Sequence, residues 1–366
     1  MNKKLYSLFG LLLVAALVLA ACGGAAPAAT EAPVEEAPAE ATDAPAEEAP
    51  AEAVALACQV TDVGGIDDKS FNATAYKGIT DAVAALGVEG QYLESQEQAD
   101  YETNINAFVD QGCDLIVTVG FLLGDATYAA ADANPGQKFA IVDYGSNFDG
   151  NTRENLVGLN FATQEAAFLA GYVAAASTQT GVVATFGGLN IPPVTAFMDG
   201  FWHGVNYYNA ENGTSVRVLG WDANTQDGLF VGNFESTDDG RTMGESLLDE
   251  GADIIMPVAG PVGLGTAAAV TERGNAWIIG VDTDWTVSAA EYTPVILTSV
   301  LKNMDIAVYG QIEAVVNGTY AGGDYLGTLA NGGVGLAGSF PDLQAALDAI
   351  AAGIADGSIQ TIGAPQ

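Results

Sequence analysis

The chain has 366 residues and carries 46 acidic against 10 basic residues, a formal net charge of −36. This acidic excess argues against nucleic-acid binding, where Lys and Arg must neutralise phosphates. The only histidine, His203, and three scattered cysteines exclude a two-histidine metal site and argue against a zinc cluster. The folded part is long enough for two lobes of ordinary size.

Residues 1–21 have the pattern of an export signal. Two lysines precede an apolar run at 8–21, which is shorter than the about 20 residues that a membrane-spanning helix needs. The run ends in Leu-Ala-Ala directly before Cys22, a pattern that resembles the bacterial lipobox. A plain signal peptide with an incidental cysteine is the alternative. We expect Cys22 to carry a lipid that anchors the protein to the outer face of a membrane.

Residues 22–53 form the next segment, rich in Ala, Pro and Glu, with eight acidic and no basic residues. The segment has too few large apolar residues to bury a core. Its prolines favour extended polyproline conformation, at about 3 Å per residue. We therefore expect a disordered linker that can hold a folded domain up to about 90 Å from the bilayer.

From residue 54 the sequence alternates between predicted strands and helices. The first series has strands at 54–60, 91–94, 114–119 and 139–142, and helices at 72–86, 101–111 and 123–133. After a helix at 164–177, the second series has strands at 182–186, 215–219, 253–256 and 276–281, and helices at 193–208, 240–250 and 264–272. A strand at 294–298 and helices at 304–316 and 343–355 follow. This repetition predicts an α/β protein with two doubly wound lobes, each a parallel sheet with helices on both faces.

Acidic residues and glycines follow several of the predicted strands. They are Asp62, Gly120, Asp143, Gly187, Gly188, Gly260 and Asp282. Ligands of open α/β sheets bind at the carboxyl ends of the strands. Because these residues come from both series, we expect a binding cleft between two lobes.

Three further residues allow two interpretations each. Phe71 stands in a polar, Gly-containing loop at the end of the first strand, where it is either a stacking platform or part of a capped loop. Phe201 has a similar placement in the second series, although aromatics at helical spacing more often pack in a core. Lys302 either neutralises a cleft carboxylate such as Asp282 or is an exposed lysine at a helix start.

Cys58 and Cys113 lie in or beside neighbouring predicted strands. A disulfide requires Cα atoms within about 7 Å of each other. Because Cys113 begins its strand whereas Cys58 lies within the first one, we expect the two to be offset and unlinked.

Six segments in this order resemble one family. They are Thr-Asp-Val-Gly-Gly-Ile-Asp-Asp-Lys-Ser-Phe-Asn at 61–72, Ala-Phe-Met-Asp-Gly-Phe at 196–201, Glu-Gly-Ala-Asp-Ile-Ile at 250–255, Val-Ala-Gly-Pro-Val-Gly-Leu-Gly at 258–265, Ile-Gly-Val-Asp at 279–282 and Thr-Ser-Val-Leu-Lys at 298–302. Together they look like the basic membrane protein family of bacterial lipoproteins, which are substrate-binding proteins of ABC importers typified by a purine nucleoside receptor. The resemblance covers essentially all of residues 54–366.

The resemblance implies a periplasmic-binding-protein type I fold, with two α/β lobes joined by a three-strand hinge. We assign residues 54–162 and about 283–320 to the first lobe. We assign residues 163–282 and about 321–366 to the second lobe.

The resemblance also implies roles for individual residues. Phe71 and Phe201 would sandwich a base, and Asp62 and Asn72 would lie in the wall of the first lobe. Asn72 and Asp143 would read the polar edge of the base. Gly260, Asp282 and Lys302 would hold the ribose. The chain departs from the family at Asp284-Trp285, where Gln often stands two residues after the aspartate.

The expected function is that of a lipid-anchored, extracytoplasmic, monomeric receptor that delivers a purine nucleoside to an ABC permease. Guanosine and inosine are favoured over adenosine, because the Asp143 carboxylate can accept hydrogen bonds from N1–H. We expect no enzyme activity, no cofactor, no metal and no nucleic-acid partner. The alternatives are a receptor for another ring-containing solute such as a flavin, a surface lipoprotein without a transport role, and a hydrolase that uses Asp62, Asp143 and Asp282.

Overall fold

The computed structural model describes residues 55–362. The expected signal peptide, Cys22 and the Ala/Pro/Glu linker lie outside the described residues. Among the described residues, no helix combines the length and the apolar character needed to cross a membrane.

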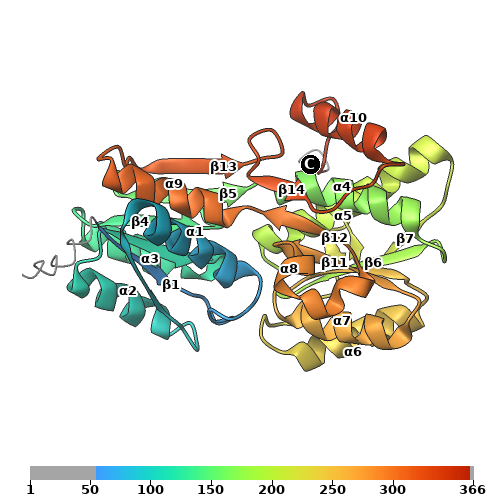
Figure 1. Ribbon diagram of the computed structural model, residues 1–366, viewed down its shortest axis with the longest axis horizontal. Helices are drawn as coiled ribbons and strands as arrows, with labels where there is room; N and C mark the ends of the chain where they lie inside the picture. Colours follow the sequence, from blue (N-terminus) through green and yellow to red (C-terminus); the bar gives the residue numbers. More distant parts are fainter. Residues whose placement is uncertain (1–54, 363–366) are drawn as a thin grey trace, which may run out of the picture. The chain divides into compact units, whose positions relative to one another are not determined.

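The first lobe is built on a parallel sheet of order β13-β5-β4-β3-β1-β2 (Figure 1). Its strands are β1 (Leu56–Val60), β2 (Glu89–Leu93), β3 (Leu115–Val119), β4 (Lys138–Val142), β5 (Leu156–Phe161) and β13 (Gly323–Gly327). Helices α1 (Phe71–Leu86) and α9 (Met304–Val316) cover one face, and α2 (Asp100–Gln111) and α3 (Gly124–Ala133) cover the other. Alternation along β3 serves both faces: Leu115 and Val117 pack under α1 and α9, whereas Ile116 packs under α2 and α3.

The second lobe is built on a sheet of order β14-β12-β11-β10-β6-β7, parallel except for β14. Its strands are β6 (Val182–Gly187), β7 (Arg217–Leu219), β10 (Ile254–Val258), β11 (Trp277–Asp282), β12 (Ile296–Lys302) and β14 (Val334–Leu336). Helices α4 (Thr163–Ser177) and α5 (Pro192–Asn212) cover one face, α6 (Thr237–Asp249) and α7 (Val262–Arg273) cover the other, and α10 (Gln344–Ala355) packs against α4. The predicted α/β fold with two doubly wound lobes is confirmed.

Short elements complete the second lobe and the loops. They are the two-strand ribbon β8 (Trp221–Asp222) and β9 (Asp227–Gly228), helix α8 (Trp285–Ser288), and the 3₁₀ turns η1 (Phe121–Leu123) and η2 (Ala290–Val295). The turn η1 begins directly after β3, and α8 and η2 follow β11. These elements therefore stand at the ends of strands, where the cleft lies.

The chain crosses between the lobes three times, at places that differ from our assignment. It passes from β5 to α4, from β12 to α9, and from β13 to β14. We had placed β12 with the first lobe and β13 with the second. Instead β12 pairs with β11 and β13 pairs with β5. Sheet membership depends on pairing between distant segments, which local patterns do not encode. We also predicted no strand at β5, which pairs with β4 and β13.

The expectation that Cys58 and Cys113 stay unlinked is wrong. The two form a disulfide, with Cα atoms 6.2 Å apart. The expected offset requires Cys113 to begin an extended strand, whereas β3 begins only at Leu115. The chain turns at Gly112, whose φ is 81°, and this turn brings Cys113 over the sheet beside Cys58. The bridge is buried in the core under α2 and α3.

Candidate functional site

A pocket lies between the carboxyl ends of the strands of the two lobes. The first lobe lines it with Asp62, Gly64, Asp68, Phe71, Asn72, Gly120, Phe121, Leu122 and Asp143. The second lobe lines it with Ile191, Pro193, Val194, Phe197, Phe234, Val258, Ala259, Gly260, Pro261, Val281, Asp282 and Lys302. Of the eight binding residues expected from the sequence, the structure brings seven to this pocket; Phe201 is not among them.

Phe201 lies in the core of the second lobe. Its side chain is fully buried between α4, α5 and the sheet. The two helices approach so closely there that a Cβ on Gly171 would lie 2.1 Å from the carbonyl oxygen of Phe201. One helical turn nearer the start of α5, Phe197 reaches the pocket instead. Only the first turns of a helix that follows a strand end can face the cleft, and Phe201 is too far along α5.

Phe234 is a pocket residue that the sequence analysis missed. It stands in the loop before α6, far in sequence from every motif that we had singled out. Its ring packs against Gly188, where a Cβ would lie 2.2 Å from Cε1 of Phe234. The available signal was the Gly187-Gly188 pair after β6, which leaves room for a large side chain from elsewhere.

Asp62, Asn72 and Asp68 form a buried polar chain at the start of α1. The Asn72 side-chain amide donates to Oδ1 of Asp62 at 2.7 Å and to Oδ2 of Asp68 at 3.2 Å. Asp68 also accepts hydrogen bonds from the backbone N–H groups of Ser70, Asn72 and Ala73 at the start of α1. Burial raises the pKa of Asp62, and it raises the pKa of Asp68 to about 7. Asn72, which we expected to read a base, therefore uses its amide to hold these two carboxyl groups in place.

Asp143 and Asp282 occupy corresponding positions in the two lobes. Asp143 follows β4 and Asp282 ends β11, the third strand in each sheet order. Both have left-handed backbone conformations, with φ of 67° and 69°. Such conformations are uncommon outside glycine and concentrate at functional sites. Burial raises the pKa of Asp282, and Lys302 opposes that shift.

A buried ion pair joins the lobes within the pocket. Lys302, the last residue of β12, donates from Nζ to Oδ2 of Asp143, and the exposed fractions of the two side chains are 2% and 7%. The same ammonium group lies 4.8 Å from the ring centroid of Phe71, 5.5 Å from that of Phe161 and 6.0 Å from that of Phe197. The two residues that we had assigned to opposite ends of a ligand are thus in direct contact.

Two further contacts cross the cleft from the loop between β1 and α1. The Ser70 hydroxyl is 2.8 Å from Oδ2 of Asp282, and it lies 3.3 Å from the carbonyl oxygen of Val281. At the exposed rim, Lys69 pairs with Glu291 at 2.9 Å. One oxygen of Asp282 is therefore used in holding the lobes together.

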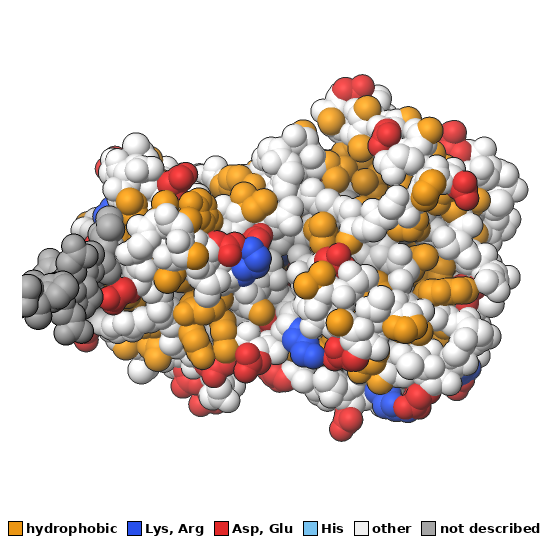
Figure 2. Space-filling view, viewed as in Figure 1, with side chains coloured by type: hydrophobic (Ala, Val, Ile, Leu, Met, Phe, Trp, Pro, Cys, Tyr) orange, Lys and Arg blue, Asp and Glu red, His pale blue; other side chains and the backbone are white. Residues whose placement is uncertain are grey.

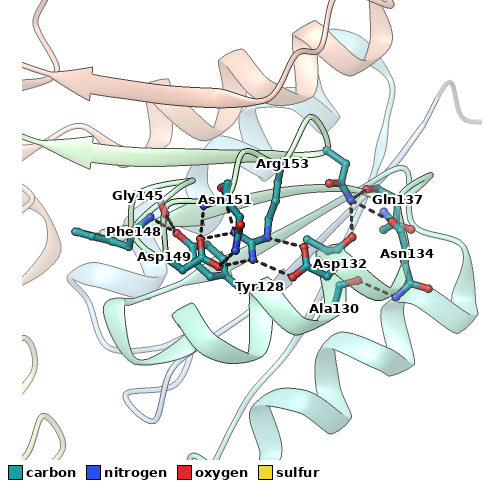
Figure 3. A network of polar contacts seen from close by, with 12 residues as sticks. Tyr128, Ala130, Asp132, Asn134, Gln137, Gly145, Phe148, Asp149, Asn151 and Arg153 are labelled. Atoms are coloured by element: carbon teal, nitrogen blue, oxygen red, sulfur yellow. Dashed lines mark hydrogen bonds and ion pairs between the residues drawn. The ribbon is translucent and has the colours of Figure 1, made fainter.

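The loop after Asp143 is fixed by an arginine network (Figure 3). Arg153 forms paired hydrogen bonds with Asp132 and with Asp149, at 2.8–3.0 Å. Its guanidinium group lies 3.8 Å from the ring centroid of Tyr128, whose hydroxyl donates to the carbonyl of Gly145. The Arg153 guanidinium holds the pKa of the Asp149 carboxyl well below its usual range. These contacts fix the loop two residues beyond Asp143.

Trp285, at the departure from the family pattern, lies behind the pocket wall. It is 1% exposed and donates from Nε1 to the carbonyl of Val281 at 3.0 Å. Asp284 caps the start of α8 by accepting from the N–H of Thr286. Neither residue lines the pocket. Trp285 and Asp284 therefore stabilise the segment at the end of β11 and do not form the pocket surface.

The comparison with protein families agrees with this architecture. Residues 55–351 match the family described as "ABC transporter substrate-binding protein PnrA-like". The chain belongs to this family.

Relatives of this PnrA-like chain carry consistent descriptions. An uncharacterised lipoprotein of Pyrococcus furiosus is 35% identical over 283 residues, which are 75% of this chain and 68% of that protein. The "ABC transporter nucleoside-binding protein BmpA" of Lactococcus lactis is 28% identical over 323 residues, which are 83% of this chain and 88% of that protein. The crystal structure of an ABC transporter solute-binding protein from Aeropyrum pernix has a TM-score of 0.74 at 30% identity, covering 85% of this chain and 94% of the other.

Membership in the PnrA-like family defines the general activity. Family members are substrate-binding proteins of ABC transporters and not enzymes; such a protein binds a small solute and works with a membrane permease. On the face in Figure 2, acidic side chains are spread widely and basic ones are few. The charge outside the pocket therefore disfavours anionic solutes.

Proposed function

We propose that the protein is a lipid-anchored, extracytoplasmic receptor that binds a purine nucleoside between its lobes for import. One observation carries this proposal: the pocket combines aromatic rings from both lobes with carboxylates at its edges. Phe71 comes from the first lobe, and Phe197 and Phe234 come from the second. A flat heterocycle can stack between such rings while its N–H and O–H groups donate to the carboxylates. The name of the Lactococcus lactis relative supports the same ligand class.

Guanosine and inosine remain our preferred ligands. Asp143 faces the pocket, and Lys302 engages only its Oδ2. Oδ1 is left to accept from N1–H of guanine or hypoxanthine, whereas adenine presents a bare acceptor at N1. Placing N1 of adenine against a buried carboxylate leaves two acceptors without a donor, which costs on the order of 1–3 kcal/mol of binding free energy. This corresponds to about tenfold weaker binding or more.

Ribose recognition is the second part of the proposal. Oδ1 of Asp282 accepts no hydrogen bond from the described residues and is available to a sugar hydroxyl. Gly260, with φ of 55°, exposes its backbone to the pocket. Lys302 would turn from Asp143 toward a sugar hydroxyl when ligand enters. The receptor would act as a monomer, since one chain supplies both walls.

Calorimetric titration of guanosine, inosine, adenosine and riboflavin into the full chain tests the proposal. We expect guanosine and inosine to bind at least about tenfold more tightly than adenosine. Asp143→Asn should reduce that difference. Equal affinities for the three nucleosides would remove the role of Asp143, and binding of riboflavin alone would replace the nucleoside by a flavin.

The anchor is tested separately. Cys22→Ala should move the protein from the membrane fraction to the soluble fraction. Retention of this variant in membranes after removal of the signal peptide would contradict the lipid anchor.

A further inference from the structure

The pocket has an uneven balance of charged groups. Asp62, Asp68, Asp143 and Asp282 line it, and Lys302 is the single basic residue among the lining residues. Asp62, Asp68 and Asp282 are more than nine-tenths buried. The side chain of Asp143 is 7% exposed and contacts buried Lys302. Buried carboxylates need a compensating positive charge or strong hydrogen-bond donors. Asp68 accepts four hydrogen bonds at the start of α1, which leaves one ammonium group for the other three carboxyl groups.

Three of these carboxyl groups have one oxygen held by the protein and one oxygen left open. Oδ1 of Asp62 accepts from Asn72 and from the N–H of Gly64, whereas its Oδ2 accepts no hydrogen bond from the described residues. Asp282 uses Oδ2 for Ser70 and leaves Oδ1 free in the same sense. Asp143 likewise engages only Oδ2. The pocket therefore offers fixed, unused acceptors at three separate places on its wall.

Three aromatic rings in and beside the pocket already surround a cation. The Lys302 ammonium group lies within 6.0 Å of the ring centroids of Phe71, Phe161 and Phe197. The faces of aromatic rings attract positive charge, most strongly where water is excluded. Oδ2 of Asp62 and Cε1 of Phe71 would lie 3.2 Å and 3.5 Å from a Cβ on Gly120, so the carboxylate and the ring border the same space. A ring stacked on Phe71 would have a carboxylate at its edge.

From this combination we propose that the pocket binds purine nucleosides with a positively charged base, such as N7-methylated ones, more tightly than neutral ones. This inference rests on the proposed function, because it assumes that the base stacks on the Phe rings. A cationic base would gain from the stacked rings and from the open oxygen of Asp62. A neutral base gains only dispersion and hydrogen bonds at the same positions.

The test compares two ligands of the same shape. 7-Methylguanosine carries a positive charge on its base, whereas 7-methyl-7-deazaguanosine is neutral and keeps the methyl group. Both are titrated into the full chain by calorimetry over a pH series in which N1 of 7-methylguanosine keeps its proton. The comparison is made at the highest of these pH values, because burial raises the pKa of Asp62 and its carboxylate must be ionised. We expect the cationic ligand to bind about tenfold more tightly or better. Equal or weaker binding of the cationic ligand would overturn the inference.

Two variants locate the effect. Asp62→Asn keeps an oxygen for Asn72 and Gly64 and replaces the open oxygen by an amide, so the ratio of the two affinities should fall by several-fold. Glu211→Gln removes one acidic charge from an exposed position of α5 and should leave the ratio unchanged. An unchanged ratio in Asp62→Asn, in a protein that still melts cooperatively, would contradict the role of Asp62.

Guanosine itself serves as the reference for the function. If guanosine binds but the cationic ligand shows no preference, only this inference fails. If no nucleoside binds, the proposed function fails and this inference fails with it.

Discussion

The two lobes share one strand order but present different walls to the pocket. At the end of β1 the first lobe has Asp62, and at the end of the corresponding β6 the second lobe has Gly188. The carboxylate of Asp62 faces the pocket, whereas the missing side chain of Gly188 admits the ring of Phe234. Equivalent positions in a repeated fold thus supply acceptors on one side and apolar surface on the other.

The lobes also differ in how they are stabilised. The first lobe contains the Cys58–Cys113 disulfide, and the sequence of the second lobe contains no cysteine. In the second lobe, α4 and α5 approach closely at Gly171 and Gly204. The first lobe therefore has a covalent link at the strand that leads to Asp62, and the second lobe has none. Four predictions test these differences.

The largest effect is expected where the two walls meet. Lys302→Met leaves Asp143 buried without its partner, which should cost about 3–5 kcal/mol in the free energy of unfolding. Urea unfolding measures this cost. The double variant Lys302→Met/Asp143→Asn carries no unpaired charge and should recover most of the loss. A single variant as stable as wild type would show that the ion pair does not couple the lobes.

The next effect concerns the staple of the first lobe. Replacing Cys58 and Cys113 together by alanine should lower the free energy of unfolding by about 2–4 kcal/mol. Hydrogen exchange should report the loss in β1, β3 and α2 but not in the second lobe. Wild-type protein that is unfolded, reduced and refolded without the disulfide should show the same loss in the free energy of unfolding. Equal protection losses in both lobes would show that the bridge does not act locally.

The third effect is a pH dependence of the free energy of unfolding, which comes from Asp68 in the first lobe. Because burial raises the pKa of Asp68 to about 7, the folded state holds this proton more tightly than the unfolded chain does. The associated stability is fully present below the unfolded pKa, near 3.8, and is lost as pH rises through about 7. Between these limits, wild type should lose stability relative to Asp68→Asn with a slope that approaches about 1.4 kcal/mol per pH unit. A difference that is constant with pH would contradict the assignment.

The smallest effect compares the aromatic rings of the two walls. Phe71→Ala and Phe234→Ala should each weaken nucleoside binding by about tenfold to a hundredfold, corresponding to roughly 1–3 kcal/mol of stacking. Phe148→Ala, at a side chain that is 64% exposed and outside the pocket, is the matched control. If only one of the two pocket variants binds more weakly, the ring stacks on one lobe and not on both.

The sequence by itself determined the repeated strand–helix alternation and most of the polar wall. Short apolar strands followed by Asp or Gly are local patterns, and the carboxyl ends of parallel strands necessarily meet at one edge. That rule is why Asp62, Asp143, Gly260 and Asp282 could be placed in the pocket without a structure. The same reasoning left Phe71 and Lys302 open between two interpretations, and their place in the pocket was expected from the family resemblance.

Only the tertiary structure decided which side chains from distant segments share a space. Helical spacing gave Phe197 and Phe201 the same face of α5, and the close approach of α4 placed Phe201 in the core. The turn at Gly112 brought Cys113 to Cys58, and the pairing of β12 with β11 carried Lys302 to Asp143. Local sequence specifies backbone periodicity, whereas these contacts depend on the geometry of packing between elements far apart in the chain.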